Sequence, residues 1–589
     1  MDIRKVGIVG CGTMGSGIAE VIARSGVGVA FVEVGPQQVE TGFDRIRRSL
    51  QRAVDRGKLE AAEREALLER ISGSTELDTL GDCDLIVEAV PESLEVKQGI
   101  FRKLDALAKP EAILATNTSS LPIIDLAVTT DRADRVLGFH FFNPAPVMKL
   151  IELIRTVVTD PEVVATCQAF GQAMGKTPVV AQDRAGFIAN LLLFPYLNQA
   201  VAMYEAGAAS REDIDAAMQL GAGHPMGPLA LMDLIGLDSG TAIMEQMFAH
   251  FADTRYAPRP VVRHLVTADY LGRKVGRGFY TYAEPGSHKT LANGATERDP
   301  ADERSIAGWS TVGVVGTGTM ATGIAEACAK AGFTVVVRGR SAEKAQHAVA
   351  AVDASLAKAV EKGKLETAAR DEIAARLSAT ADLAELGDCD LVIEAVAEDL
   401  AVKRDLFAQI DAVAKPEALL ATTTSSLPVI DCAMATARPE RVVGIHFFNP
   451  VRAMRLVELV STPRTADDAM VEARAFTEKI DKHAVLCRDQ AGFIVNALLF
   501  PYLNDAVKML EEGYATAHDI DTAMKLGCGH PMGPFELMDV VGLDVTLQIC
   551  KALHAEFREP GFTPAALLGY MVSAGYLGRK AGRGFYVYG

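Results

Sequence analysis

The sequence lacks the cysteine pattern of a metal-binding or disulfide-stabilised protein. Its nine cysteines include no Cys-x-x-Cys pair, the spacing that marks many zinc and redox sites. We therefore expect reduced thiols, no bound metal and a cytoplasmic location.

Long uninterrupted apolar stretches are also missing. The most apolar segment, residues 187–204, is broken by Asn190, Pro195 and Asn198, so it predicts a buried helix and not a membrane span. Residues 1–5 lead directly into an apolar run, which leaves no room for the core of a signal peptide. We expect no membrane partner.

Positive charge is in deficit, since 59 Lys and Arg stand against 76 Asp and Glu and give a formal net charge of −17. Sequence-independent binding to nucleic acid or to an anionic membrane needs surplus basic residues to neutralise phosphates. The composition argues against both partners but allows a small basic pocket for a phosphorylated ligand. With 589 residues, of which 49% are hydrophobic, the chain predicts several globular domains.

The sequence contains one very long repeat. The segment 6–14 returns at 312–320, and His140-Phe-Phe-Asn-Pro returns at His446, each with an offset of 306 residues. A constant offset of this length indicates duplication of a whole protein and not a solenoid. Residues 284–308 lie outside the repeat and are rich in Gly, Asp, Glu, Ala and Pro, which predicts an exposed linker.

Each copy begins with alternating strand and helix patterns. These predict a mainly parallel sheet with helices on both faces, the α/β arrangement of a Rossmann-like domain. Helical patterns lie between most of the Val/Ile/Leu-rich runs, which are at 6–9, 29–33, 84–90, 112–116 and 136–141.

From about residue 186 the segments become longer and helical. In 211–220, for example, Asp213 and Asp215 form a polar side opposite Ile214 and Met218. We therefore expect an all-α second domain in each copy. The predicted domains are 1–184 and 309–490 (Rossmann-like), and 185–283 and 491–589 (helical).

A glycine-rich turn follows the first predicted strand. Gly10, Gly12 and Gly15 form a Gly-x-Gly-x-x-Gly pattern between this strand and a helical pattern. The glycines allow a tight turn, close approach of a pyrophosphate and close helix packing, and the helix N-terminus attracts the phosphates. Glu33 ends the second strand, where a carboxylate binds a ribose 2′-hydroxyl and repels a 2′-phosphate. The first copy is predicted to bind NAD.

The second copy keeps this turn but loses the acid. Gly316 and Gly318 match the first two glycines, and Ala321 replaces the third, which the pattern tolerates. The position of Glu33 is taken by Gly339.

Two arginines, Arg338 and Arg340, flank that glycine, and guanidinium groups suit a 2′-phosphate. Two interpretations are open. Either the second copy prefers NADP, or its site has drifted toward weak or no cofactor binding and the arginines are surface charges.

Oxidation of a secondary alcohol needs a base for the hydroxyl proton. His140 ends a predicted strand, at the sheet edge where α/β sites form, and an imidazole titrates near neutral pH. Glu152 follows 12 residues later on the next apolar run. A turn between the two runs can bring the carboxylate to the imidazole, where it would orient the ring and stabilise the imidazolium.

Each copy resembles the short-chain L-3-hydroxyacyl-CoA dehydrogenase family, which includes bacterial 3-hydroxybutyryl-CoA dehydrogenases. The resemblance covers 6–282 and 312–588, with one departure at His224, where the family often has Tyr. The motifs that carry it are Asn117-Thr-Ser-Ser-Leu121, Gly138-Phe-His-Phe-Phe-Asn-Pro144, Met148-Lys-Leu-Ile-Glu152, Gly186-Phe-Ile-Ala-Asn190 and Pro225-Met-Gly-Pro-Leu-Ala-Leu-Met-Asp233.

The resemblance implies a catalytic His140–Glu152 pair and an oxidoreductase of fatty-acid or butanoate metabolism. It gives Ser119, Asn143 and Asn190 roles toward the substrate oxygens and the nicotinamide, although Ser119 in a turn or cap is the plain structural alternative. The implied cofactor contacts are Glu92, Lys97 and Lys274. The second copy retains the equivalents Ser425, His446, Asn449, Glu458, Asn496, Glu398, Lys403 and Lys580, which favours two active sites.

Basic residues cluster after the second strand of each copy, in an otherwise acidic chain. The resemblance implies that such residues bind the phosphates of CoA, whereas the alternative is a solvated helix face. The residues are Arg45, Arg47, Arg48, Arg52, Arg56 and Lys58 in the first copy, and Lys358, Lys362 and Lys364 in the second.

The predicted function is therefore hydride transfer between NAD(P) and C3 of a 3-hydroxyacyl-CoA, with 3-hydroxybutyryl-CoA as the expected substrate. Two alternatives are open: a dehydrogenase of a free hydroxy acid, or one catalytic copy joined to a structural or regulatory one. Because family enzymes usually pair through their helical domains, we also expect 185–283 to pack on 491–589 as an internal pseudo-dimer.

Overall fold

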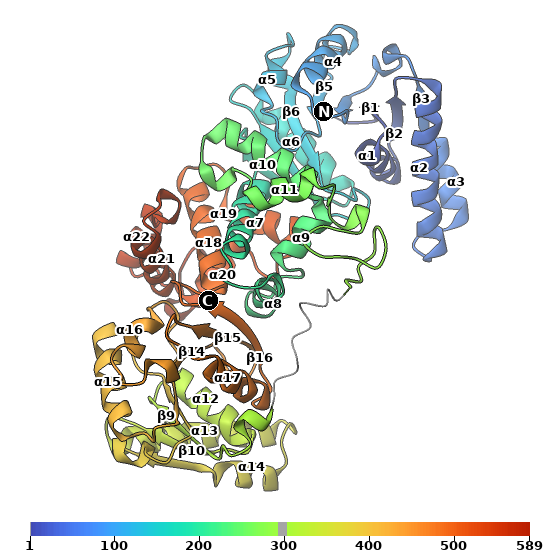
Figure 1. Cartoon of the computed structure of the whole chain (residues 1–589). Coiled ribbons are helices and arrows are strands. Elements are labelled where there is room, and N and C mark those ends of the chain that lie inside the picture. Colours follow the sequence, from blue (N-terminus) through green and yellow to red (C-terminus); the bar gives the residue numbers. More distant parts are fainter. Residues whose placement is uncertain (1, 292–302) are drawn as a thin grey trace.

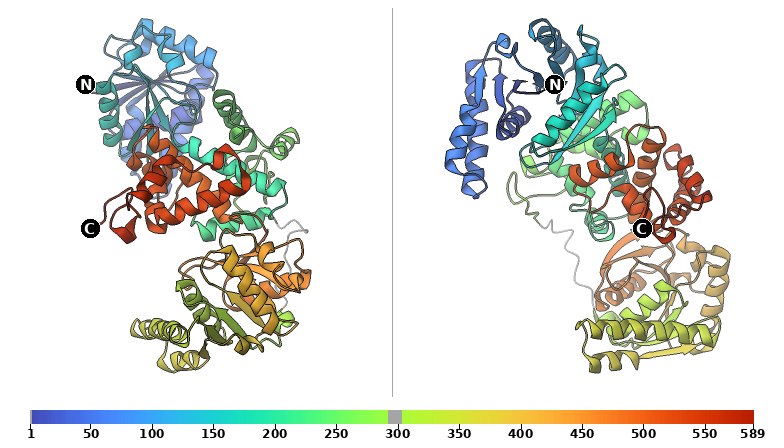
Figure 2. Two further views of the ribbon diagram at one scale, coloured as in Figure 1. Left: turned by 90° about the vertical axis from the view of Figure 1, so that its left-hand side faces the viewer. Right: turned by 180° about the vertical axis from the view of Figure 1, so that it is seen from behind.

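The computed structural model describes residues 2–291 and 303–589. Two eight-stranded sheets with flanking helices lie toward opposite ends of the molecule, and the two helical domains lie between them (Figures 1 and 2). The strands of the first sheet are β1 (Lys5–Val9), β2 (Gly28–Val32), β3 (Ile71–Ser74), β4 (Leu85–Glu88), β5 (Ile113–Thr116), β6 (Val136–Phe141), β7 (Leu150–Arg155) and β8 (Thr177–Gln182).

The strand order β3-β2-β1-β4-β5-β6-β7-β8 confirms the predicted doubly wound sheet. Every neighbouring pair is parallel except β6 and β7, which are antiparallel. Strands β4 and β5 are buried along their whole length, as continuous apolar runs between two helix layers should be. The helices of this domain are α1 (Thr13–Arg24), α2 (Pro36–Asp55), α3 (Ala61–Glu69), α4 (Leu94–Leu107), α5 (Ile124–Ala127) and α6 (Pro161–Ala173).

The second sheet repeats the order of the first, as β11-β10-β9-β12-β13-β14-β15-β16. Its strands are β9 (Thr311–Val315), β10 (Thr334–Arg338), β11 (Leu377–Thr380), β12 (Leu391–Glu394), β13 (Leu419–Thr422), β14 (Val442–Phe447), β15 (Leu456–Ser461) and β16 (His483–Arg488). Its helices are α12 (Thr319–Lys330), α13 (Ala342–Glu361), α14 (Thr367–Ala374), α15 (Leu400–Val413), α16 (Val429–Ala433) and α17 (Asp467–Lys479).

The remaining helices form the two C-terminal domains. In the first copy they are α7 (Ala189–Glu205), α8 (Arg211–Gly221), α9 (Pro228–Ile235), α10 (Leu237–Phe251) and α11 (Pro260–Thr267). In the second they are α18 (Val495–Glu511), α19 (Ala517–Gly527), α20 (Pro534–Val541), α21 (Leu543–Phe557) and α22 (Ala566–Ser573). Most of the apolar segment 187–204 is a buried helix, as predicted. This helix, α7, begins at Ala189 and contains Pro195. No described helix is long and apolar enough to cross a membrane.

The polar side predicted for residues 211–220 is buried. Asp215 accepts hydrogen bonds from the backbone N–H groups of Leu229 and Ala230 and from the Tyr280 hydroxyl, so its carboxylate satisfies the free N–H groups at the start of α9. Asp213 accepts the Leu486 N–H of the second copy. Both carboxylates accept backbone N–H groups and are therefore buried, although their spacing in the sequence is typical of a solvent-exposed helix face.

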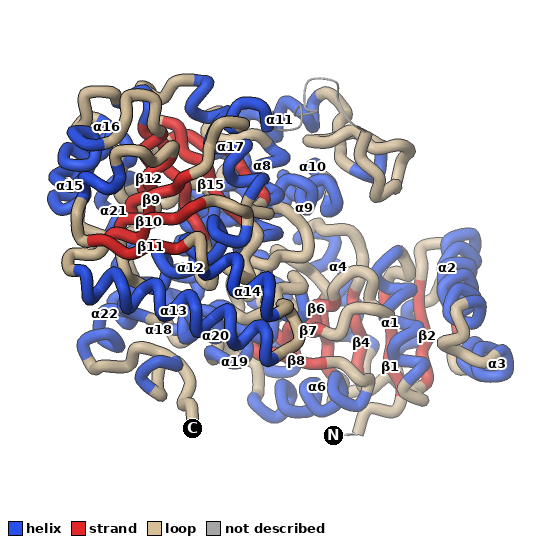
Figure 3. Tube along the Cα trace, turned by 90° about the horizontal axis from the view of Figure 1, so that it is seen from below, coloured by secondary structure: helices blue, strands red, loops and turns tan. Residues whose placement is uncertain are grey.

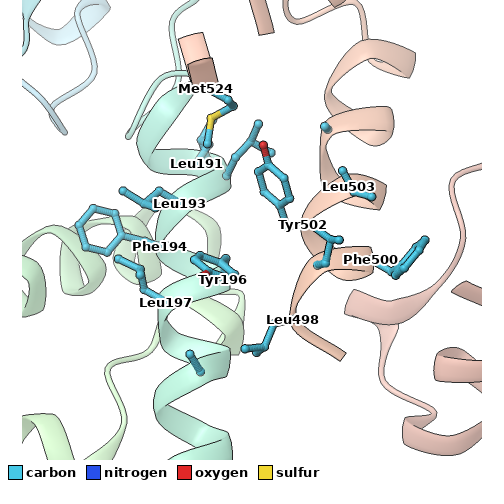
Figure 4. Close-up of a cluster of buried hydrophobic side chains, with 14 of the residues drawn as sticks. Leu191, Leu193, Phe194, Tyr196, Leu197, Leu498, Phe500, Tyr502, Leu503 and Met524 are labelled. Carbon is cyan, nitrogen blue, oxygen red and sulfur yellow. The ribbon is translucent and has the colours of Figure 1, made fainter. Parts of the chain in front are cut away.

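The two helical domains share one cluster of buried hydrophobic side chains. Figure 4 shows Tyr196 on α7, and Leu498 and Tyr502 on α18, pointing into the space between these helices. On the same boundary His224 and His530 stack with ring centroids 4.0 Å apart. Each ring lies beside the tyrosine hydroxyl of its own copy, at 3.2 and 3.3 Å.

Each helical domain also reaches the sheet of the other copy. Helix α8 contacts β15 and β16, and α19 contacts β7 and β8. The backbone pairs Gln182 N–Tyr514 O (3.3 Å) and Arg488 N–Ala208 O (2.9 Å) repeat this contact in both directions.

Both ends of the segment predicted as a linker contact the copy that they adjoin. Tyr282 and Thr290 form a β-bridge, while Ile306 is 1% exposed and Trp309 lies against Phe476. The middle of the predicted linker, 292–302, lies outside the described residues.

Candidate active sites

The first candidate site is built on the antiparallel pair β6 and β7. Their register sets His140 directly opposite Glu152, and His140 Nδ1 lies 2.8 Å from Glu152 Oε2. The other carboxylate oxygen accepts the N–H groups of Ile188 and Ala189 at 3.1 and 2.9 Å. Three groups on two segments, β6 and the start of α7, therefore fix the Glu152 carboxylate, and Glu152 is completely buried.

The turn that supplies these N–H groups has an unusual backbone. Gly186 and Phe187 both have positive φ, at 87° and 54°, and a Cβ at Gly186 would lie 2.8 Å from Met247 Cε of α10. The Phe187 ring lies 5.4 Å from the imidazole. The turn therefore brings the start of α7 against both members of the His140–Glu152 pair.

The second copy builds the same arrangement. His446 Nδ1 lies 2.6 Å from Glu458 Oε2, and Glu458 Oε1 accepts the N–H groups of Ile494 and Val495 at 3.1 and 2.8 Å. In both copies the carboxylate engages Nδ1 and leaves Nε2 for another partner, which is the arrangement of an oriented general base.

The glycine-rich turn of the first copy fits a dinucleotide. Gly10 has a φ of 90°, and a Cβ at Gly15 would lie 1.9 Å from the Gly10 carbonyl oxygen, so both positions require glycine. No described heavy atom outside its chain neighbours lies within 4 Å of a Cβ built on Gly12. This leaves open space at the N-terminus of α1, where helix N–H groups attract phosphate. Glu33 accepts the Cys11 and Val34 N–H groups at 2.7 and 3.2 Å, beside this turn.

The second copy has the same glycine-rich turn, but different residues lie beside it. Gly316 has a φ of 143° and Ala321 is buried. A Cβ at Gly339 would lie 2.7 Å from the Ala345 backbone N and 3.0 Å from Thr317 Cγ2, so the backbone itself disfavours an acid at this position. Arg340 is exposed, and among the described residues Arg338 Nε is buried without a hydrogen-bond partner.

A buried ion pair that the sequence did not reveal lies beside each turn. Lys97 is 1% exposed and donates to both oxygens of Glu88, at 2.8 and 3.0 Å. It also lies 3.3 Å from Glu92. Lys403 is equally buried against Glu394 and lies 3.3 Å from Glu398. A signal was available, since Glu88 and Glu394 are acids that end completely apolar strands.

Lys97 therefore faces the interior and not an open cleft. The structure sets it behind Glu92, whose carboxylate accepts the Thr118 hydroxyl and the Ser119 N–H. The Lys97 ammonium and these donors together hold the pKa of Glu92 below its ordinary value against the effect of burial, which is the largest single influence. Glu398 has the same environment and the same direction of shift.

The remaining predicted site residues differ in their individual contacts. Lys274 pairs with Asp238, and Lys580 with Asp544, at 2.6 Å. Asn143 and Asn449 are exposed, each before a cis proline. Asn496 donates to the Ser425 carbonyl oxygen at 3.2 Å. Ser119 lies beside Ser120, which contacts Gln246 of α10, a residue that the sequence did not single out.

The basic residues proposed for CoA lie on α2 and α13 and just beyond them. Figure 3 shows α2 and α3 beside β2, toward the end of the first sheet at which β3 is the edge strand. Arg47 is already paired with Glu40 and Asp44, which leaves the end of the helix as the candidate surface. No ion pair among the described residues involves the exposed groups there, which are Arg52, Arg56 and Lys58, with Lys358, Lys362 and Lys364 in the second copy.

A doubly wound sheet with a phosphate-binding turn, next to a buried His–Glu pair, defines an NAD(P)-dependent dehydrogenase site. The two copies each contain both parts. The chain belongs to the 3-hydroxyacyl-CoA dehydrogenase family: the family's NAD-binding domain matches residues 5–184 and 311–490, and its C-terminal domain matches 186–282 and 492–588.

Known proteins of this family resemble either one copy or the whole chain. A 3-hydroxybutyryl-CoA dehydrogenase of Mycobacterium tuberculosis is 48% identical over 282 residues, which is 99% of that protein and 48% of this chain. A probable 3-hydroxybutyryl-CoA dehydrogenase of Bacillus subtilis is 43% identical over 284 residues, 99% of its length and 48% of this chain. A solved 3-hydroxybutyryl-CoA dehydrogenase structure from Escherichia coli matches 98% of this chain and 100% of its own, with a TM-score of 0.71 and 27% identity.

Proposed function

We propose that both copies oxidise 3-hydroxyacyl-CoA, or reduce the 3-oxo form, with 3-hydroxybutyryl-CoA as the principal substrate. The observation that carries this proposal is the His–Glu pair beside a dinucleotide-binding turn, present in both copies with nearly equal distances of 2.8 and 2.6 Å. The names of the relatives support the acyl-CoA class of substrate.

In the oxidative direction, Nε2 of His140 accepts the proton of the 3-hydroxyl group as hydride leaves C3. The Glu152 carboxylate holds the Nδ1 proton and stabilises the imidazolium that forms. The nicotinamide, when bound, accepts the hydride. In the reductive direction the same imidazolium donates its Nε2 proton to the developing alkoxide.

Neutral side chains around the pair are assigned to binding and orientation. Ser119 and Asn190 donate to the substrate oxygens, and Asn143 contacts the carboxamide of the nicotinamide. Glu92 lies at the cofactor side of the site, and we assign Lys97 a positioning role through it. Lys274 contacts the cofactor from the helical domain. The second copy uses the equivalent residues in the same roles.

The two copies are proposed to differ in cofactor. The Glu33 carboxylate favours a free ribose 2′-hydroxyl and therefore NAD in the first copy. In the second copy the acid is absent. Arg338 Nε has no hydrogen-bond partner among the described residues, and Arg340, two positions further along the chain, is exposed, which favours the 2′-phosphate of NADP.

For the CoA phosphates, we propose the exposed basic residues at the ends of α2 and α13. We also propose that the contact of α7 with α18 replaces the dimer contact of single-copy relatives, which makes the chain an internal pseudo-dimer. The divisions at 184/185 and 490/491 are the boundaries that we propose within the copies.

A steady-state assay of acetoacetyl-CoA with NADH and with NADPH tests the function. We expect turnover with both cofactors in the intact chain, and saturation at lower concentration for the CoA ester than for free acetoacetate. Equal or greater activity with the free acid would contradict the acyl-CoA assignment and favour a hydroxy-acid dehydrogenase.

A further inference from the structure

The turn that fixes the catalytic glutamate is held in different ways in the two copies. In the second copy the turn is closed from within, because the Gln490 side chain donates to the Phe493 carbonyl oxygen at 2.8 Å. In the first copy the equivalent of Gln490 is Arg184. Its side chain does not close the turn but reaches the second copy.

Arg184 contacts two residues at the end of α18 and the loop that follows. Its guanidinium pairs with the Glu512 carboxylate and lies over the Tyr514 ring, 5.0 Å from the centroid. The positions equivalent to Glu512 and Tyr514 in the first copy are Ala206 and Ala208. The second copy therefore supports the turn of the first, and the first provides no such side chains in return.

Tyr514 is well placed for this support. Its side chain is 2% exposed, and its carbonyl oxygen accepts the Gln182 N–H of β8, next to the turn. Among the described residues its hydroxyl has no hydrogen-bond partner. Tyr514 therefore contributes through its ring, which packs between the two copies and lies against the Arg184 guanidinium.

Only a few residues separate Arg184 from the backbone groups that hold Glu152, so a change at Arg184 can displace the catalytic pair. Arg184 begins the turn, and its carbonyl oxygen accepts the Phe187 N–H at 3.1 Å. The next two N–H groups, of Ile188 and Ala189, hold Glu152. Small displacements of such a carboxylate alter the orientation of the imidazole, and misplacement of reacting groups by about 1 Å lowers turnover.

We propose that Arg184 and Tyr514 are positioning residues for the first active site, so that catalysis by the first copy depends on the second copy but not the reverse. This inference rests on the proposed function of the two sites. An exposed ion pair contributes little to folding stability, so the effect of Arg184→Ala is expected in turnover and less in unfolding. Tyr514→Ala also removes a buried ring and should lower stability as well.

The test uses full-length chains in which one site is silenced, with His446→Gln leaving the first copy active and His140→Gln leaving the second. In the first background, Arg184→Ala and Tyr514→Ala should each lower kcat about three- to tenfold, with KM for the cofactor unchanged. The acid limb of the kcat–pH profile for oxidation should move to lower pH, because a displaced carboxylate stabilises the protonated imidazole less. Tyr514→Phe should retain activity, since the hydroxyl has no partner.

Two matched controls separate positioning from general damage. In the second background Tyr514→Ala should leave kcat unchanged, while Gln490→Ala should lower it. In the first background, Arg184→Gln combined with Tyr514→Ala should recover most of the lost activity, because glutamine can close the turn internally as it does in the second copy.

The outcomes are distinguishable. If the His446→Gln chain has no activity before further change, the proposed function of the first copy fails. If that chain is active but the Arg184 and Tyr514 variants keep full kcat, or if Tyr514→Ala lowers both copies equally, the positioning role is wrong.

Discussion

The two copies are alike at the buried His–Glu pair, and they differ beside the glycine-rich turn and where they meet each other. His140–Glu152 and His446–Glu458 share register, distances and backbone donors. The Glu33 position has become Gly339, and the supporting turn residue Arg184 has become Gln490. A duplicated enzyme can vary cofactor and contact residues one copy at a time, whereas a buried carboxylate with several donors tolerates no partial change.

The largest expected effect comes from removing what the copies share. Changing both His140 and His446 to Gln should lower turnover by about 10²- to 10⁴-fold, the usual contribution of a positioned base. Cofactor binding, followed by fluorescence titration of NADH, should change little because neither imidazole lies in the glycine-rich turn. Each single variant should report the other copy alone.

This experiment also decides whether the comparison is between two enzymes. If His446→Gln has no effect on total activity with either cofactor, the second copy is a structural or regulatory partner. Full activity in the double variant would remove the proposed mechanism altogether.

A smaller effect is expected where the copies differ in charge. In the His140→Gln background, where only the second copy turns over, changing Arg338 and Arg340 together to Ala should raise the KM for NADPH about ten- to a hundredfold, because a charge-assisted hydrogen bond contributes about 1.5–3 kcal/mol. The KM for NADH should change much less. The matched control is Glu33→Gln in the His446→Gln background, which should relax the first copy toward NADPH.

The readout is the ratio of the KM values of the two cofactors for each chain, because only the copy that keeps its histidine turns over. If the parent His140→Gln chain has equal KM values for NADH and NADPH, Arg338 and Arg340 are ordinary surface charges. The copies would then differ in sequence beside the glycine-rich turn but not in the cofactor that they prefer.

The sequence predicted the central strands of each sheet but not the edge strands. Strands such as β4 and β5 are continuous apolar runs because helices cover both faces. Strands β3 and β8 lie at the two edges and are only partly buried, so they lack that signal and were not predicted.

The candidate site, like the sheet, was predicted only in part from the sequence. The type and spacing of His140 and Glu152 pointed to the pair, and its register came from the structure. Lys97 was expected at the cofactor. The structure encloses its ammonium between Glu88 and Glu92, and its contact with the cofactor stays a prediction. The contact of Arg184 with Tyr514 joins residues from different copies, and no local pattern encodes a partner so distant in the chain.

The smallest expected effect concerns a feature that both copies contribute to equally. Burial lowers the pKa of His224 to about 4 and that of His530 to about 3, the latter with a further contribution from the neighbouring ring. The pKa of a histidine in the unfolded chain is near 6.5, so between this pH and about 4 the unfolded chain binds protons at these two positions and the folded chain does not. Stability should therefore fall as the pH drops from about 6.5 toward 4, by on the order of 1 kcal/mol per histidine between pH 7 and 5.5. Urea unfolding at these two pH values should show this loss in the natural chain and a smaller loss in the His224→Gln/His530→Gln variant, which keeps polar side chains but cannot titrate. An equal loss in both chains would mean that the stack is not the element that makes the contact between the copies sensitive to acid.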